Sequence, residues 1–335
     1  MNAAASSDDA LFSIKRSALV DNRGVSYTAK RRTLTPRWGV VWRDLALGWL
    51  TVIGIMIPVI QVSHVSVTFA VLSAVAGAVL VGFFIAFVML FIHEAAHRNI
   101  HPDPRWNDIL NNLFISGILG ADVETYRRVH WEHHRNFGNA MDTEISYRDP
   151  LNLRFVVEAL FGIRLARSIL LRRSQVRSLD AQKAVEGGSG TRVYVLLGGL
   201  LFNAALVSGL AYGREWAAIF AWVCGIFVVF PFLGALRQIL EHRGELPPSA
   251  HATADTICFA TNRLFGDGPL AGTLGAAGFN RHLLHHWDPQ VSYTRLRELE
   301  EYLLDTEAGG YLRQHQTTYF DTFFQLFTIS ARGRS

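Results

Sequence analysis

Eight of the thirteen histidines in this 335-residue chain fall into three short clusters, one with the pattern HxxxH and two with the pattern HxxHH. A spacing of four residues places two imidazoles on the same face of a helix, where both can bind one metal ion or two neighbouring ions. The clusters therefore predict a metal site made of imidazoles. The candidate ligands are His93, His97, His130, His133, His134, His282, His285 and His286.

A ninth histidine, His242, lies between the second and third clusters in the sequence. Eight or nine imidazoles exceed the about four to six ligands that one such ion commonly takes, so the count implies two ions. Imidazole ligation without thiolates suits iron, copper, zinc or nickel, and two irons are the pair that activates dioxygen. Two cysteines, Cys224 and Cys258, are too few for a thiolate site or a disulfide framework.

The first cluster, His93-Glu-Ala-Ala-His97, also matches the HExxH pattern of zinc proteases, in which the glutamate is a general base. A zinc site needs only one further ligand, which would leave six of the nine histidines without a function. An intramembrane zinc protease is therefore an alternative of a different class. A transport protein is another; it predicts charged or broken helices within the apolar stretches described next, where only Pro58 and Pro231 offer a break.

Half of the residues are hydrophobic and only 18% are charged, whereas a typical soluble domain has about 25% charged residues. The apolar residues concentrate in four stretches, and a stretch of about 20 such residues can cross about 30 Å of hydrocarbon. The last three contain no charged residue, which disfavours buried helices of a soluble core. The stretches are 45–60, 65–92, 193–212 and 216–236.

Of the 32 lysines and arginines, only Arg214 falls on the far side of these four spans. By the positive-inside rule, the other side is the cytoplasm of a bacterial inner membrane or an equivalent membrane. We predict an all-α, multi-pass membrane protein, with four transmembrane helices in two hairpins and a cytosolic helical cap that holds the site and both termini. The segments are an N-terminal segment 1–44, hairpin 45–92, cap 93–192, hairpin 193–236 and cap 237–335 with a C-terminal helix.

Two further segments of the cap, 111–120 and 151–171, are expected to be helices that lie along the membrane surface or pack on the cap. We also expect a cavity, kept free of bulk water, that reaches from the cap into or beside the bilayer.

The three clusters together with two hairpins resemble the membrane fatty acid desaturase family, over residues 45–304 of this chain. The segment that follows the third cluster, Trp287-Asp-Pro-Gln-Val-Ser-Tyr293, is similar to the tail of that family. The resemblance implies a non-haem site of two iron ions, which uses O2 and two electrons to introduce a C=C double bond into a fatty acyl chain. It also implies that the cluster histidines are the ligands, and that His242 is the extra ligand found after the fourth span.

The resemblance extends to hydroxylases, ketolases and enzymes of small metabolites on the same scaffold, which remain alternatives to an acyl desaturase. The third cluster begins with His282, where the cytochrome-fused branch of the family usually has glutamine, and no His-Pro-Gly-Gly haem motif occurs. Electrons are therefore expected from a separate ferredoxin or cytochrome b5-like protein with its reductase. The basic face would attract such acidic carriers and anionic lipids, and no nucleic-acid partner is expected.

Several other side chains are candidates to support the site. Asn139 and Asn280 could position a metal-bound water, and Arg237 could pair with a substrate head group or lie at the membrane edge. Five carboxylates could accept hydrogen bonds from ligand imidazoles and fix their tautomers. These are Glu94, Glu132, Glu241, Asp142 and Asp288.

Overall fold

The computed structural model describes residues 14–138, 141–164, 166, 167, 170, 191–244 and 261–332. Within these residues all regular elements are helices, and no strand is formed. This confirms the predicted all-α class. Residues 1–13, 171–190 and 245–260, which belong to the predicted cytosolic segments, lie outside the described residues, as does Asn139.

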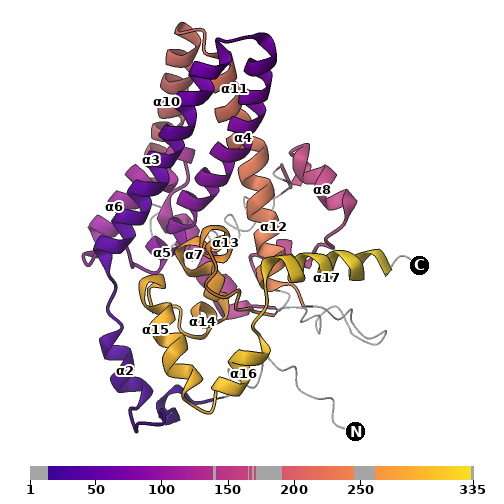
Figure 1. Cartoon of the computed structure of the whole chain (residues 1–335). Helices are drawn as coiled ribbons and strands as arrows, with labels where there is room; N and C mark the ends of the chain where they lie inside the picture. Colours follow the sequence, from indigo (N-terminus) through magenta and orange to yellow (C-terminus); the bar gives the residue numbers. More distant parts are fainter. Residues whose placement is uncertain are drawn as a thin grey trace.

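Four helical segments are long and apolar enough to cross a membrane, as predicted. They extend together to one end of the molecule (Figure 1). Each is longer than its apolar stretch, because the helix continues into polar residues that hydropathy does not detect. The segments are α3 (Trp38–Ser63), α4 (Val67–Met89) with α5 (Phe91–Ala96), α10 (Thr191–Tyr212), and α11 (Trp216–Cys224) with the π-helix η4 (Gly225–Val229) and α12 (Phe230–His242).

Helix α4 packs against α3, α11 and η4 through small residues. A Cβ added at Gly77 would lie 2.6 Å from Cγ2 of Val59, and one at Gly82 would lie 2.4 Å from Cβ of Val229. In the same contact, the carbonyl oxygen of Gly225 in η4 would lie 2.7 Å from the Cβ added at Gly82. Small residues let helix backbones approach closely in a membrane. This contact fixes the second and fourth spans, which both run on into the cap.

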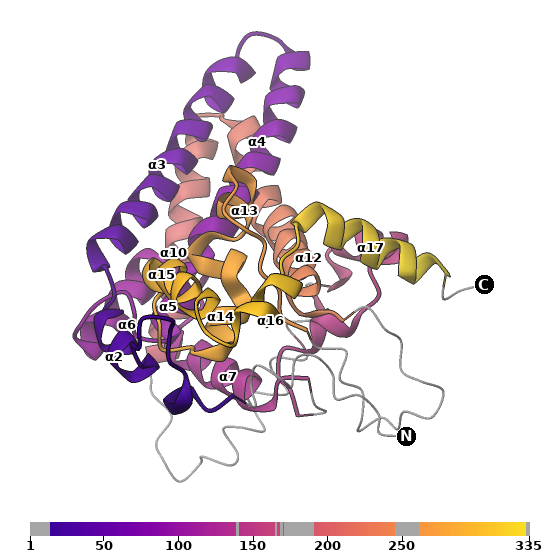
Figure 2. The same cartoon turned by 60° about the horizontal axis from the view of Figure 1, so that its bottom comes forward.

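The cap is built around short helices that follow the spans (Figure 2). Those that carry histidines are α5, α7 (Val123–Asn136), the end of α12, and α14 (His282–Trp287). Helices α15 (Tyr293–Leu304), α16 (Gly309–Gln314) and α17 (Tyr319–Arg332) follow α14, and α13 (Pro269–Leu274) precedes it. The cap therefore brings together residues from the middle and the end of the chain.

The segment before the first span packs against the cap. Helix α2 (Tyr27–Thr33) carries Tyr27, which donates a hydrogen bond to Asp288, and Arg31, whose Nε lies 3.2 Å from Oδ2 of Asp288. Leu19 and Leu34 are buried in one apolar cluster with residues of α14 and α15. The polar composition of this segment did not indicate this packing.

Two helices lie near the expected interfacial segments. Helix α6 (Pro104–Phe114) begins seven residues before the predicted 111–120, because Asp103 Oδ1 accepts hydrogen bonds from the N–H groups of Arg105 and Trp106. A short 3-10 helix, η2 (Ser116–Leu119), follows it. Helix α8 (Leu153–Leu160) lies within the predicted 151–171 and exposes Leu153 and Leu160.

Candidate metal centre

The nine histidines converge from four helices into two adjacent groups. Helix α5 supplies His93, and His97 directly follows this helix as its C-cap residue; α7 supplies the first HxxHH cluster, α12 its last residue, and α14 the second HxxHH cluster. Seven of the nine are fully buried, and His97 and His134 are partly buried. The three histidine clusters and His242, which are far apart in the sequence, therefore lie together at one place in the structure.

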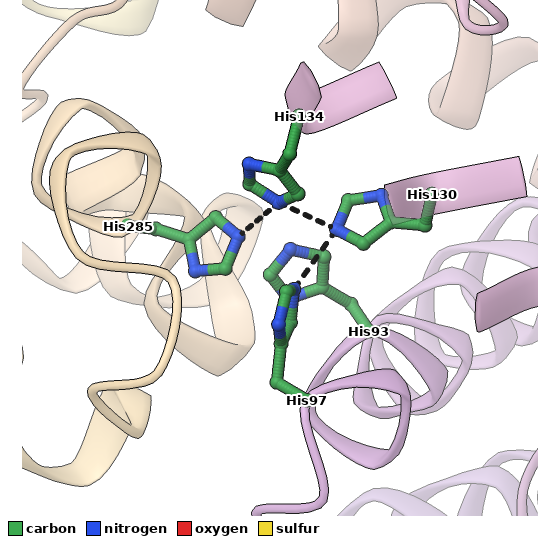
Figure 3. Close-up of side chains that lie close together, drawn as sticks. All are labelled: His93, His97, His130, His134 and His285. Carbon is green, nitrogen blue, oxygen red and sulfur yellow. Dashed lines mark hydrogen bonds between the residues drawn. The ribbon is translucent and has the colours of Figure 1, made fainter. Parts of the chain in front are cut away.

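The first group contains five imidazoles whose nitrogens all lie within 4.8 Å of one another. Nε2 atoms are 3.0 Å apart in three successive pairs, His97 with His130, His130 with His134, and His134 with His285 (Figure 3). His93 completes the group, and its ring centroid is 4.1 Å from that of His285. Two nitrogens that bind one ion at about 2.1 Å, at right angles, would be about 3.0 Å apart. The spacing therefore fits ligands around an ion.

The second group contains His133, His242 and His286, whose nitrogens also lie within 4.8 Å of one another. His282 adjoins it, since its Nε2 lies 3.0 Å from Nε2 of His242 and 3.2 Å from Nε2 of His286. The rings of His134 and His286 are 4.5 Å apart and link the two groups. This arrangement could hold two ions side by side.

Burial first, and then the nearby imidazoles, lower the pKa of several of these side chains well below the usual histidine value. These are His97, His134, His282, His285 and His286. For His133 burial opposes the charge, but the carboxylates of Glu144 and Asp142 outweigh it and raise the pKa. Neutral imidazole is the form that binds metal ions, so most of the site is in the ligand form.

The buried nitrogens without a partner also fit a metal. Both ring nitrogens of His93 and Nε2 of His133 have no hydrogen-bond partner among the described residues. Buried polar atoms normally have a partner, and an exception indicates a missing water or ion. The donors are imidazole nitrogens without any thiolate, a set that suits iron, copper, zinc or nickel.

Asp142 makes the contact predicted for a supporting carboxylate. Its Oδ1 accepts a hydrogen bond from Nδ1 of His133 at 2.7 Å, which leaves Nε2 facing the second group. Burial opposes ionisation of Asp142, but hydrogen bonds from His133, Tyr147 and the N–H of Glu144 outweigh it and lower the pKa of Asp142. The carboxylate therefore orients the imidazole.

Four other predicted supporting residues hydrogen-bond away from the imidazoles. Glu94 Oε2 accepts from Ser292 Oγ and from the N–H of Tyr293, and Glu94 Oε1 is 3.9 Å from Nδ1 of His93. Glu132 accepts from Arg135, and Asn280 donates to the carbonyl of Gly266. Asp288 faces Tyr27 and Arg31, as described above.

The sequence did not single out two residues that contact ligands. Glu144 Oε1 lies 3.2 Å from Nδ1 of His130, and Glu144 Oε2 accepts a hydrogen bond from Nε2 of Gln238. Asn262 Oδ1 lies 3.1 Å from Nδ1 of His242. Glu144 lies only two residues beyond the candidate Asp142, and this short distance in the sequence could have indicated it. Asn262 is separated from its partner by 20 residues, and no spacing indicates it.

A cavity of about 650 Å³ is lined both by these histidines and by the membrane helices, where the sequence predicted one. His93, His130, His242 and His282 line one part of it. The rest of the wall is mostly apolar and includes residues of α4 and α12. Two further predicted residues, Arg237 and Glu241, line it as well; they form an ion pair with Nε and Oε1 3.3 Å apart.

The chain matches one family model, described as fatty acid desaturase, over residues 69–318. This range is three quarters of the sequence and includes all nine histidines and, except for the first two residues of the second span, the three spans after the first. The match agrees with the helical architecture and the histidine site described above.

Proposed function

Because the chain belongs to the fatty acid desaturase family, we propose that it is a membrane oxidoreductase that introduces a C=C double bond into a fatty acyl chain. The observation that carries this proposal is the position of the nine imidazoles. They lie in two groups at the end of an apolar cavity that extends along the membrane helices. An apolar chain can enter such a cavity and present its C–H bonds to the site.

We assign the nine histidines as ligands of two non-haem iron ions. His93, His97, His130, His134 and His285 would hold one, and His133, His242, His282 and His286 the other. When bound, such a pair would supply the activation of O2. In the overall reaction O2, two hydrogens of the acyl chain, two electrons and two protons give a C=C double bond and two waters.

The protein itself orients the ligands and excludes water. Asp142, Glu144 and Asn262 each face an Nδ1 atom, of His133, His130 and His242. Such partners fix the imidazole tautomer and leave the other nitrogen for the ion. The apolar cavity wall keeps bulk water from the reacting carbons, which prevents loss of the oxidant in side reactions.

We further propose that the cap faces the cytoplasm and receives electrons from a separate ferredoxin or cytochrome b5-like protein. The uneven distribution of basic residues supports this orientation. His97 and His134, the two partly buried histidines of the first group, place that group nearest to solvent.

The test is lipid and metabolite profiling of cells that express the chain under air, with two matched variants. His285→Ala removes a proposed ligand, whereas His64→Ala removes an exposed histidine that pairs with Glu215 at the far end of the spans. We expect a new double bond with the unaltered chain and with His64→Ala, and none with His285→Ala. A new hydroxyl group instead, or no oxygen-dependent product, would overturn the proposal.

Metal analysis distinguishes the proposal from the zinc protease alternative. We expect about two irons per chain, reduced in His285→Ala and retained in His64→Ala. In a zinc protease Glu94 would act as a general base, but here its carboxylate accepts hydrogen bonds from Ser292 and Tyr293. A single zinc ion per chain, unaffected by His285→Ala, would favour the protease.

A further inference from the structure

The N-terminal arm, which we define as residues 14–34, lies at the end of the molecule opposite to the turns of the two membrane hairpins (Figure 1). It contains the 3-10 helix η1 (Arg16–Ala18) and α2. Its residues Leu19 and Leu34 are buried in the apolar cluster that holds α14 and α15. The arm is therefore part of the cap surface, on the side that is turned away from the bilayer.

The arm is strongly basic. Its one carboxylate, Asp21, pairs with Arg23. Lys15 and Arg32 are exposed and Lys30 is partly exposed, and none of the three has a carboxylate partner among the described residues. Anionic lipids attract basic residues close to the membrane surface, so these charges face the aqueous phase instead. The six cations of the arm are Lys15, Arg16, Arg23, Lys30, Arg31 and Arg32.

Neighbouring carboxylates do not cancel this charge. Asp288 pairs with Arg31, and the carbonyl of Asp305 accepts a hydrogen bond from the N–H of Asn22 in the turn between η1 and α2. Even with Asp21, Asp288 and Asp305 counted, the six cations leave an excess of three positive charges. A basic surface of this kind attracts an acidic protein.

The arm covers the end of α14, the helix that supplies three of the nine histidines. The guanidinium of Arg16 donates a hydrogen bond to the carbonyl of Trp287, and its Cζ lies 5.1 Å from the centroid of the Trp287 ring. The ring of Tyr27 lies 4.8 Å from the same indole. Trp287 is buried and directly follows His285 and His286, one from each proposed iron group. A protein bound to the arm therefore lies over the helix that holds ligands of both groups.

We propose that the N-terminal arm is the docking surface for the electron carrier, and that this carrier is a soluble acidic protein; the inference rests on the proposed function and specifies its partner. Two molecules of reduced carrier would each lose one electron per double bond formed, which supplies the two electrons of the proposed reaction. None of the described residues of the arm lines the cavity. The carrier and the acyl chain can therefore be bound at the same time.

Binding of an acidic ferredoxin to the purified full chain tests this inference without any turnover. The chain is placed in nanodiscs of phosphatidylcholine, so that the lipid has no net charge. In the arm variant Lys15, Lys30 and Arg32 are replaced by glutamate. In the matched variant the same change is made at three exposed arginines on α6 and at or near α8, which are Arg105, Arg154 and Arg167.

We expect the arm variant to bind ferredoxin about 10- to 100-fold more weakly than the unaltered chain at low salt, because like charges then face each other across the contact. The difference should disappear at about 1 M salt, where charges are screened within about 3 Å. The matched variant should bind as the unaltered chain does, and basic cytochrome c should bind none of them. Equal binding by the arm variant, or equal loss in the matched variant, would overturn the proposal.

Two other occupants of the arm predict different results. Loss of binding to vesicles of phosphatidylglycerol in the arm variant, with ferredoxin binding unchanged, would assign the arm to a lipid surface. A change of oligomeric state in analytical ultracentrifugation, with ferredoxin binding unchanged, would assign it to a second copy of the chain. Either result would overturn the proposal. Thermal unfolding at the same temperature in all three chains confirms that the variants are folded.

Docking and product formation fail separately. A chain that binds ferredoxin through the arm but forms no oxygen-dependent product would overturn the proposed function and keep the arm as a surface for an acidic protein. If the arm variant and the unaltered chain form the double bond at the same rate with ferredoxin, the docking surface is wrong and the function stands. With dithionite as the reductant, we expect equal rates in both chains.

Discussion

Asp142→Asn is the substitution that tests the organisation of the site most directly. Oδ1 of Asp142 accepts hydrogen bonds from Nδ1 of His133 at 2.7 Å and from the N–H of Glu144 at 2.9 Å. Oδ2 accepts from Oη of Tyr147 at 2.7 Å and from the N–H of Gly138 at 3.2 Å. The substitution preserves the shape of the side chain but replaces one acceptor with an NH2 group. Whichever way the amide is oriented, its NH2 group faces hydrogen-bond donors.

The cost depends on which way the new amide turns. If its NH2 group faces Tyr147 and Gly138, the tyrosine hydroxyl can rotate and accept, but the N–H of Gly138 loses its partner. A buried donor without a partner costs about 1–3 kcal/mol. If the NH2 group faces His133, the imidazole must accept at Nδ1 and carry its proton on Nε2, which then cannot bind a metal ion. Loss of such a partner typically weakens metal binding about 10- to 100-fold.

We therefore expect Asp142→Asn to lower the stability of the metal-free protein by about 1–3 kcal/mol if the NH2 group faces Gly138, or to lower its iron affinity about 10- to 100-fold if the NH2 group faces His133. Thermal unfolding measures the first effect, and chelator competition followed by metal analysis measures the second. Tyr147→Phe is the matched control. It removes one hydrogen bond from the same carboxylate without a change at His133, and should cost about 0.5–1.5 kcal/mol with iron affinity unchanged.

If both the stability and the iron affinity stay unchanged in Asp142→Asn, the reasoning is refuted, because Asp142 would then not hold His133 in place. If Tyr147→Phe weakens iron binding as much as Asp142→Asn does, the effect comes from the stability of the surrounding loop. Either result would separate the geometry of the site from its stability.

Three further substitutions test the cavity and the spans. Gly234 lines the cavity, and a Cβ there would meet no atom within 4 Å, so Gly234→Leu should weaken substrate binding by about tenfold; Gly54→Leu, at an equally open but exposed position, should leave binding unchanged. Gly82→Leu should lower stability by at least about 1–3 kcal/mol in thermal unfolding, because its Cβ would lie 2.4 Å from Val229; an unchanged midpoint would contradict the close packing. Asn203→Leu should cost about 1–2 kcal/mol, since Asn203 accepts from Nε1 of Trp222 and donates to the carbonyl of Ile118; adding Trp222→Phe should recover part of that loss.

The spans and the histidine clusters could be predicted because both depend on local patterns. Twenty apolar residues in a row indicate a membrane helix wherever they occur, and four-residue spacing places His93 and His97 on one helix face. The convergence of α7, α12 and α14 is not local; the number of histidines in the clusters and the family resemblance indicated it, but no local pattern did.

The supporting residues show why the remainder could not be predicted. Asp142 and Asp288 both lie near a histidine cluster in the sequence, yet only Asp142 contacts an imidazole, while Asp288 faces Tyr27 and Arg31. Asn262 reaches His242 across a long stretch of chain. Such contacts depend on how separate helices pack, which spacing in the sequence does not encode.

The packing of α2 against α14 has a consequence for biosynthesis. Leu19, Tyr27 and Leu34 leave the ribosome before any transmembrane helix is made, but their buried partners, such as Trp287 and Leu299, are among the last residues to emerge. Domains commonly fold from the N-terminus as they are synthesised, but this cap cannot. Residues 14–37, which are synthesised first, must remain unpacked at the membrane surface until both hairpins have been inserted. Pulse labelling with limited proteolysis should therefore find residues 14–37 cleavable until synthesis is complete, and the metal site should assemble after translation.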